Sequence, residues 1–202
     1  MICIRNGLLF VGLFLLGACA GVEGDVLVAV PAYQAQTGAS LLSAAPPMAI
    51  RFGAFRRNVG TGQLAGRIGE RKTIGNISLG LVTASPAPGK LVRDAFLAEI
   101  KAAGHRSDNS AAVSFEGEVL RFVLRTDVTA LYWDVVLDAG ISVLVQNPSA
   151  RRTGNYSAVC TERTYAWPGV DIIARVINNC LAKLTGKFRN DRAIARLLAG
   201  SS

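Results

Sequence analysis

Residues 131–145 read LYWDVVLDAGISVLV, and every odd position in this stretch is apolar. Polar residues such as Asp134, Asp138 and Ser142 stand at even positions. Because successive side chains of a strand point to opposite faces, this period of two predicts one long strand with one buried face and one polar face. The apolar positions are Leu131, Trp133, Val135, Leu137, Ala139, Ile141, Val143 and Val145.

Segments with strand character lie on both sides of this long strand. Phe115–Leu124 precedes it, and Thr153–Glu162 follows it after a turn marked by Asn147-Pro148. Together the three segments predict an antiparallel meander.

The chain ahead of the meander is less regular. Asp25–Val30 is a short strand-like run closed by Pro31, and residues 34–47 are rich in small and polar residues, which indicates a flexible loop. Met48–Phe55 alternates and predicts a strand. Residues 56–75 hold many glycines and arginines with no clean period, so they predict a mobile hairpin or loop.

Three segments change to helical spacing. Residues 90–103 carry an apolar stripe with Glu99 off it, and Gly104 follows where a left-handed residue would end the helix. A second helix opens near Pro168, and Asn190-Asp191 can cap a short third one. The two long stripes consist of Val92, Phe96, Ile100 and Ala103, and of Ile173, Ile177, Cys180, Leu184 and Phe188.

These elements predict an α+β fold with a mainly antiparallel sheet, a long central strand, two main helices packed on one face and a short C-terminal helix. A chain of 202 residues with 50% hydrophobic residues has enough apolar material for one core. We therefore expect residues 48–202 to form a single α+β lipoprotein domain. Residues 19–47 would hold a lipidated N-terminus, the short strand and the flexible loop.

The N-terminus has the features of an export signal. Arg5 precedes an apolar run over residues 7–18, which is too short to span a membrane as a helix. The run ends in Leu16-Gly17-Ala18-Cys19, which resembles the lipobox of bacterial lipoproteins. The alternative is an ordinary secretory signal that happens to contain a cysteine. The lipobox predicts that the signal peptide, residues 1–18, is removed and that Cys19 is lipidated.

Lipidation decides the compartment. The Cys19 thiol would take up a diacylglyceryl group, and with a further chain such as palmitate the anchor becomes effectively permanent. Residue 20 is Ala and not Asp, which resembles an outer-membrane address. We expect a lipid-anchored protein on the periplasmic face of the outer membrane, in preference to the inner membrane.

The exported part is strongly basic. The chain carries +8 at pH 7, and removal of Arg5 with the signal leaves +7. Export excludes nucleic acid as a partner, so the positive residues either form a solvated surface or contact an anionic component of the envelope. The candidates for that contact are Arg56, Arg57, Arg71, Lys72, Lys183, Lys187, Arg192 and Arg196.

Residues suited to catalysis are scarce. His105 is the only histidine, which excludes histidine-paired nucleophiles and multi-histidine metal sites. Its place after Gly104 indicates a structural role at the end of a helix. We expect no catalytic residues, no metal site and no cofactor.

Two cysteines remain in the exported domain. Cys160 lies on a predicted strand, and Cys180 lies on the inner stripe of the helix expected to cover it. In an oxidising periplasm they can form a disulfide. The alternative is a pair of small buried thiols.

The lipobox, Ala-Gly-His at 103–105, the meander around 131–145, the run DIIARVINN at 171–179 and the run NDRAIARLL at 190–198 resemble the YajG-type family of bacterial lipoproteins. More distantly, the layout is similar to the auxiliary lipoproteins of envelope lipid transport, of the PqiC and LptE kind. The resemblance carries no catalytic signature.

The anchor and this resemblance together imply a non-enzymatic interaction or accessory module of an envelope assembly or transport system. Its partners would be the membrane, through Cys19, and an envelope protein or an anionic envelope component. The alternative is a lipid-binding or small-molecule-binding module of the periplasm, with a crevice between helices and sheet.

Overall fold

The structure is a computed structural model that describes residues 24–57 and 65–200. The expected signal peptide, residues 1–18, and the expected lipidation site, Cys19, lie outside the described residues. The strands are β1 (Val26–Ala29), β2 (Ala49–Arg57), β3 (Arg67–Lys72), β4 (Ser78–Ser85), β5 (Arg106–Ser107), β6 (Val113–Val128), β7 (Trp133–Gln146) and β8 (Arg151–Thr164). The helices are the single-turn η1 (Leu41–Ala44), α1 (Pro88–Ala102), α2 (Val170–Arg189) and α3 (Arg192–Ala199).

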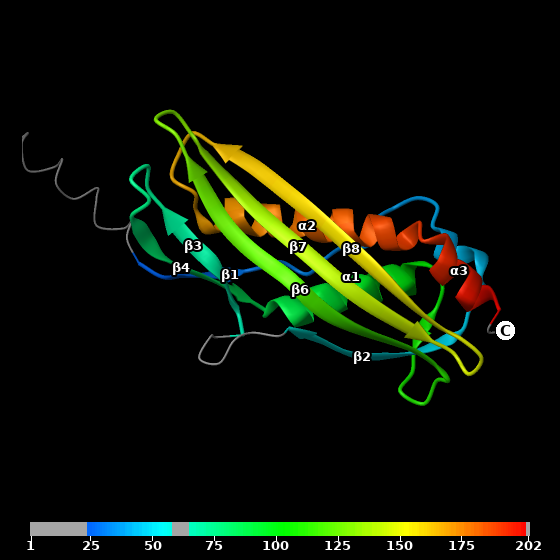
Figure 1. Cartoon of the computed structure of the whole chain (residues 1–202). Helices are drawn as coiled ribbons and strands as arrows, with labels where there is room; N and C mark the ends of the chain where they lie inside the picture. Colours follow the sequence, from blue (N-terminus) through cyan, green and yellow to red (C-terminus); the bar gives the residue numbers. More distant parts are fainter. Residues whose placement is uncertain (1–23, 58–64, 201–202) are drawn as a thin grey trace, which may run out of the picture.

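The three longest strands dominate the molecule. β6, β7 and β8 pair antiparallel along their whole length, from Val128 beside Trp133 at one end to Gln146 beside Arg151 at the other. Figure 1 shows them as a twisted ribbon in front of α1 and α2. The predicted meander is present, and its flanking strands are longer than the sequence pattern indicated.

The prediction of a mainly antiparallel sheet is wrong, because the sheet is mixed. Parallel pairs join β1 to β4, β5 to β2, and both β2 and β3 to β6. A parallel pair needs a crossover connection. Here α1 returns the chain along β2, so that β6 starts at the end of the sheet where β2 started (Figure 1).

β6 is the central strand of the whole sheet, because its edge away from β7 pairs with β2 over one half and with β3 over the other. The pairing with β7 shifts between Val119 and Arg121, where Leu120 forms a bulge. A bulge changes which alternate positions face the core. Arg57 fills the gap between the two partners of β6, donating to the carbonyls of Arg67 (2.7 Å) and Phe122 (3.2 Å).

The helix ends follow local sequence signals. α1 begins at Pro88, and the chain leaves it through Gly104, whose φ of 96° is the predicted left-handed conformation. α2 begins at Val170, two residues after Pro168. Asp191 caps α3 by accepting from the backbone N–H groups of Ala193 and Ile194.

The space between the helices and the sheet is filled by aromatic rings. Phe96 of α1 and Phe188 of α2 lie 4.7 Å apart between ring centres, and both contact Tyr156 of β8. Phe115 of β6 and Phe52 of β2 extend the cluster. The expected crevice between helices and sheet is therefore occupied by core side chains.

A buried polar cluster ties the chain between β1 and η1 to both long helices. Glu99 of α1 lies 3.4 Å from the Arg189 guanidinium of α2, and Tyr33 donates to Glu99 at 2.7 Å. Arg189 also donates to the carbonyls of Gln36, Gly38 and Ala39. The expectation that Glu99 lies off the inner stripe is wrong. It follows Phe96 by three residues and Val92 by seven, which is the spacing of one helical face.

Candidate functional site

The face of β6–β8 that points away from α1 and α2 carries no helix in the described part of the chain (Figure 1). Polar and charged side chains alternate outward along all three strands. A sheet face left open in this way is where a partner can dock, because no part of the described chain competes for it. We call it the open face. Its outward residues include Arg121, Val123, Arg125, Asp127, Asp134, Asp138, Ser157, Val159 and Arg163.

Ion pairs neutralise one half of the open face. Arg163 of β8 donates two hydrogen bonds to Asp134 of β7, at 2.8 and 2.9 Å, and lies over the ring of Tyr132. Arg121 pairs with Asp138 at 2.8 Å. The hydrogen bonds from Arg163 hold the pKa of Asp134 below its ordinary value. Both carboxylates are therefore ion-pair partners of arginines.

A hollow with an apolar rim lies in the middle of the open face. Gly140 forms its floor, beside Arg121 and Ser157. Leu120, at the bulge, lines the hollow, and Val123 and Val159 lie one outward position further along their strands, on either side of Asp138. These three side chains are exposed to 59%, 47% and 56%. Exposed aliphatic side chains grouped round a concavity are typical of protein interaction surfaces.

The other half of the open face carries charges of both signs. A shallow depression there is lined by residues of β2, β6, β7 and β8, among them Arg56, Glu116, Glu118 and Ser142. Arg56 stands beside Glu118 in the register of β2 with β6. Both halves of the open face therefore hold arginines and carboxylates side by side.

The eight candidate cations do not form one patch. Arg71 is buried, with its guanidinium over Trp167 and donating to the Gly24 carbonyl, and Arg57 fills the break along β6. The Arg71 side chain therefore lies inside the fold and is not available as a surface contact, whereas Arg57 is half-buried, with backbone carbonyls engaging its guanidinium group. Lys72 pairs with Glu70 at 2.8 Å.

The remaining candidates are spread over the molecule. Arg192 and Arg196 are exposed on α3, at the opposite end from β3 (Figure 1). Arg56 lines the depression on the open face, beside Glu118.

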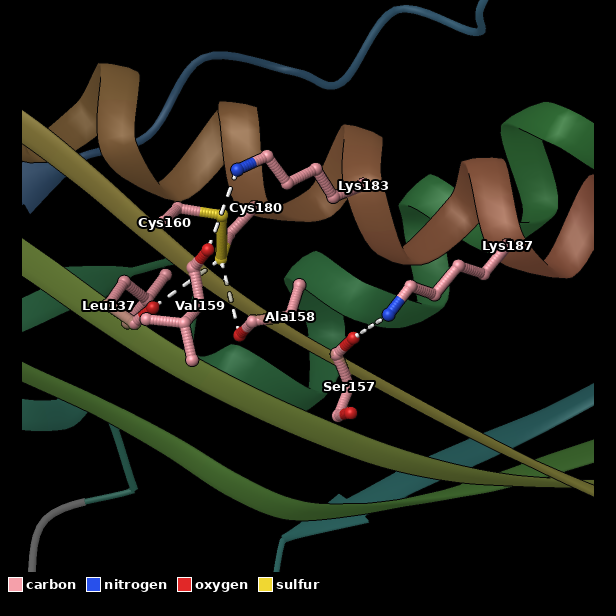
Figure 2. The surroundings of a disulfide bond; sticks show 8 residues. All are labelled: Leu137, Ser157, Ala158, Val159, Cys160, Cys180, Lys183 and Lys187. Carbon is pink, nitrogen blue, oxygen red and sulfur yellow. Dashed lines mark hydrogen bonds between the residues drawn. A yellow bond between two sulfur atoms is a disulfide. The ribbon is translucent and has the colours of Figure 1, made fainter.

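Lys183 and Lys187 cover the free edge of β8. Figure 2 shows both side chains reaching from α2 to β8, where they donate to the carbonyls of Val159 and Ser157. Charged groups on an edge strand prevent it from pairing with another strand. Cys180 of α2 is joined to Cys160 of β8 by a disulfide, with 5.5 Å between the two Cα atoms.

His105 is buried, and its Nε2 lies 3.1 Å from the Leu42 carbonyl. Within residues 24–57 and 65–200, no three His, Cys, Asp or Glu side chains are grouped as metal ligands. No helix in this part of the chain is both long and apolar enough to cross a bilayer.

The sequence analysis did not predict the hollow or the exposed aliphatic side chains beside it. Gly140 stands at an even, outward position of the long strand, which signals a missing side chain on the polar face. Leu120 and Val123 could not be assigned, because only the bulge decides which way each points.

Comparison with known proteins supports the envelope assignment. The model of a family described as uncharacterized lipoprotein matches residues 69–199. None of the curated proteins compared with this chain matches it significantly in sequence. A Xanthomonas campestris protein of the DUF330 family is similar in structure, with a TM-score of 0.57, 9% identity, and coverage of 88% of this chain and 100% of that one. A second crystal structure, of an uncharacterized protein, has a TM-score of 0.53 and 12% identity, with coverage of 87% of this chain and 99% of that one. These likenesses are likenesses of fold.

Proposed function

Because the chain belongs to the family of uncharacterized lipoproteins, whose membership implies a lipid anchor in the membrane, we propose that it is a non-enzymatic accessory module that binds an envelope protein through the open face. The anchor in this proposal is Cys19, on the periplasmic side of the outer membrane. The order of sequence motifs supports a place among the YajG-type members. The partner would belong to an assembly or transport system of the envelope.

The aliphatic rim around Gly140 is the observation that carries the proposal. Leu120, Val123 and Val159 are exposed near the centre of the open face, and the Arg121–Asp138 ion pair lies among them. Exposed aliphatic side chains mixed with paired charges are found in protein interfaces. Asp127, Asp134 and Asp138 on this face are paired with arginines, which favours recognition over acid-base catalysis.

Substitution of Gly140 tests the proposal with little risk to the fold. A Cβ atom placed on Gly140 would meet only the Arg121 Cβ within 4 Å, at 3.7 Å, which is an ordinary contact. Gly140→Leu therefore fills the hollow without displacing the core. Lys101→Leu, on the exposed end of α1, is the matched control that adds the same side chain elsewhere.

The experiment is photo-crosslinking in cells that make the full lipidated chain. A crosslinkable residue at Val123 or Val159 should capture one envelope protein, and Gly140→Leu should abolish that capture while Lys101→Leu leaves it intact. A crosslinker at Lys101 should not capture the protein that is captured from Val123 or Val159. Equal capture from both sides of the molecule would refute the open face as the docking site, and lipid retained by the purified protein would favour the lipid-binding alternative.

A further inference from the structure

Exposed apolar side chains lie at one end of the molecule, in two hairpin turns and in the chain just after β8. Ile74 and Ile77 lie in the turn between β3 and β4 and are exposed to 65% and 66%. Leu131, between β6 and β7, and Tyr165, just after β8, are each exposed to 77%. We call these four residues the apolar tip. Figure 1 shows both hairpins at the same end, where the described chain also begins.

Hydrogen bonds order the two hairpin turns of the apolar tip. The Thr73 N–H donates to the Ile77 carbonyl at 3.0 Å, which closes the first turn. Thr129 closes the second by accepting from the backbone N–H groups of Leu131 and Tyr132. The Lys72 N–H donates to the Thr126 hydroxyl at 2.8 Å and so joins the two hairpins. These hydrogen bonds fix both turns and join the two hairpins, while Tyr165 packs edge-on against Tyr132 with 6.4 Å between ring centres.

The N-terminal chain leaves the domain beside this tip. The Gly24 N–H donates to the Leu79 carbonyl at 2.8 Å, and Arg71 donates to the Gly24 carbonyl at 2.7 Å. Cys19 is five residues before Gly24 in the sequence. Five extended residues span at most about 17 Å. A lipid on Cys19 would therefore keep this end of the domain within that reach of the bilayer.

We propose that the apolar tip inserts into the headgroup region of the bilayer beside the anchor, so that the long strands point away from the membrane. The proposal rests on lipidation of Cys19 but not on the partner of the open face. Tyrosine and aliphatic side chains suit this region, where an apolar body and a polar atom are both accommodated. The 14 residues of β7 would carry the far end of the sheet about 45 Å into the periplasm.

The charges around the tip indicate which lipids it needs. Lys72, Arg125 and Arg163 are the cations in ion pairs nearest the two hairpins, and they pair with Glu70, Asp127 and Asp134. Because acidic side chains neutralise these cations, apolar contact and not attraction to anionic lipid would seat the tip. The apolar tip should therefore insert equally into zwitterionic and anionic bilayers.

Spin labels on the full lipidated chain test this arrangement. Ile74→Cys and Leu131→Cys provide label sites in the tip, and Ser149→Cys in the turn between β7 and β8 is the matched control at the far end. The native cysteines do not compete, since Cys160 and Cys180 are bridged and lipidation consumes the Cys19 thiol. The protein is reconstituted into vesicles of phosphatidylcholine, with and without phosphatidylglycerol.

The tip labels should be several-fold more accessible to oxygen relative to a water-soluble nickel reagent than the label at Ser149, in both lipid mixtures. Adding Ile77→Ser and Leu131→Ser should return the Ile74 label to water while the protein stays on the vesicles. Equal accessibility at all three sites on vesicle-bound protein would overturn the proposal. The proposal would also be overturned if the tip labels were shielded from the nickel reagent in native envelopes but not on vesicles, because a protein would then cover the tip. Protein that does not bind the vesicles at all would refute lipidation itself.

Discussion

The two arginine–carboxylate pairs Glu99–Arg189 and Asp134–Arg163 use the same chemical groups at opposite extents of burial. The side chains of the first pair are 1% and 6% exposed, and those of the second are 19% and 49% exposed. The shorter contact, 2.8 Å, belongs to the exposed pair. Proximity alone therefore does not rank them. What differs is the number of other groups that each pair holds in place.

The buried pair organises a whole segment of chain. Arg189 engages three backbone carbonyls between residues 36 and 39, and Glu99 accepts from Tyr33 and from the Gln36 N–H. The exposed pair links two neighbouring strands that already pair along their length. A buried charge that loses its partner is costly, whereas an exposed one is resolvated by water.

The largest expected effect comes from breaking the buried pair. Glu99→Leu leaves the Arg189 charge buried and should lower the free energy of unfolding by about 3–5 kcal/mol, measured by urea denaturation followed by tryptophan fluorescence. Glu99→Gln keeps the shape and the acceptor for Tyr33, so it should cost less. The double variant Glu99→Leu with Arg189→Leu should recover part of the loss. A loss for Glu99→Leu no greater than that for Asp134→Asn would contradict this account.

The disulfide comes second, and it fixes the other side of α2. Replacing Cys160 and Cys180 with alanine opens a loop of 20 residues and should cost about 3 kcal/mol by the chain-entropy estimate. Reduced wild-type protein should unfold at the same urea concentration as the double variant. Two free thiols titrated in the unfolded, unreduced domain would show that no bridge forms.

Alkaline pH should distinguish the two pairs. Burial, and then the hydrogen bond to Glu99, raises the pKa of Tyr33. Its contribution to stability is thus complete below the ordinary tyrosine pKa of about 10 and is lost as the pH rises through the raised value. Tyr33→Phe should cost about 1 kcal/mol at neutral pH and reduce the alkaline loss. An alkaline unfolding profile identical to that of the wild type would exclude Tyr33 as its origin.

The smallest effect is expected at the exposed pair, and it lies at the opposite end of the pH scale. Arg163 lowers the pKa of Asp134, so the pair adds stability above the ordinary carboxyl pKa of about 4 and loses it as the pH falls through the lowered value. Asp134→Asn should change the urea midpoint at neutral pH by a small fraction of the change for Glu99→Leu. High salt should shrink the difference further. A salt-independent effect would mean that the pair acts through packing.

The sequence predicted those elements in which each face has the same environment, core or solvent, along the whole element. β7 has the core on one face, so every odd position from 133 to 145 is apolar. β3 and β4 escaped prediction because a buried Arg71 and a left-handed Gly80 interrupt any apolar period. The mixed sheet depends on where α1 delivers the chain, which no local pattern records.

Only part of the candidate site could be predicted from the sequence, because the rest depends on tertiary structure. The polar face of β7 follows from its even positions, but the bulge at Leu120 reverses the facing of β6 partway along the strand. Arg71 and Arg57 look like any surface cation in the sequence. Only the tertiary fold brings backbone carbonyls to their guanidinium groups.

The lysines along the free edge of β8 have a consequence for crowding. A tethered lipoprotein diffuses in two dimensions, where copies share one orientation and meet edge to edge far more often than in free solution. An uncovered β8 would present matching carbonyls to every neighbour. With Lys183 and Lys187 occupying them, collisions between copies end in like-charge repulsion. The same two side chains that complete the hydrogen bonding of one molecule thus oppose edge-to-edge pairing of β8 between copies.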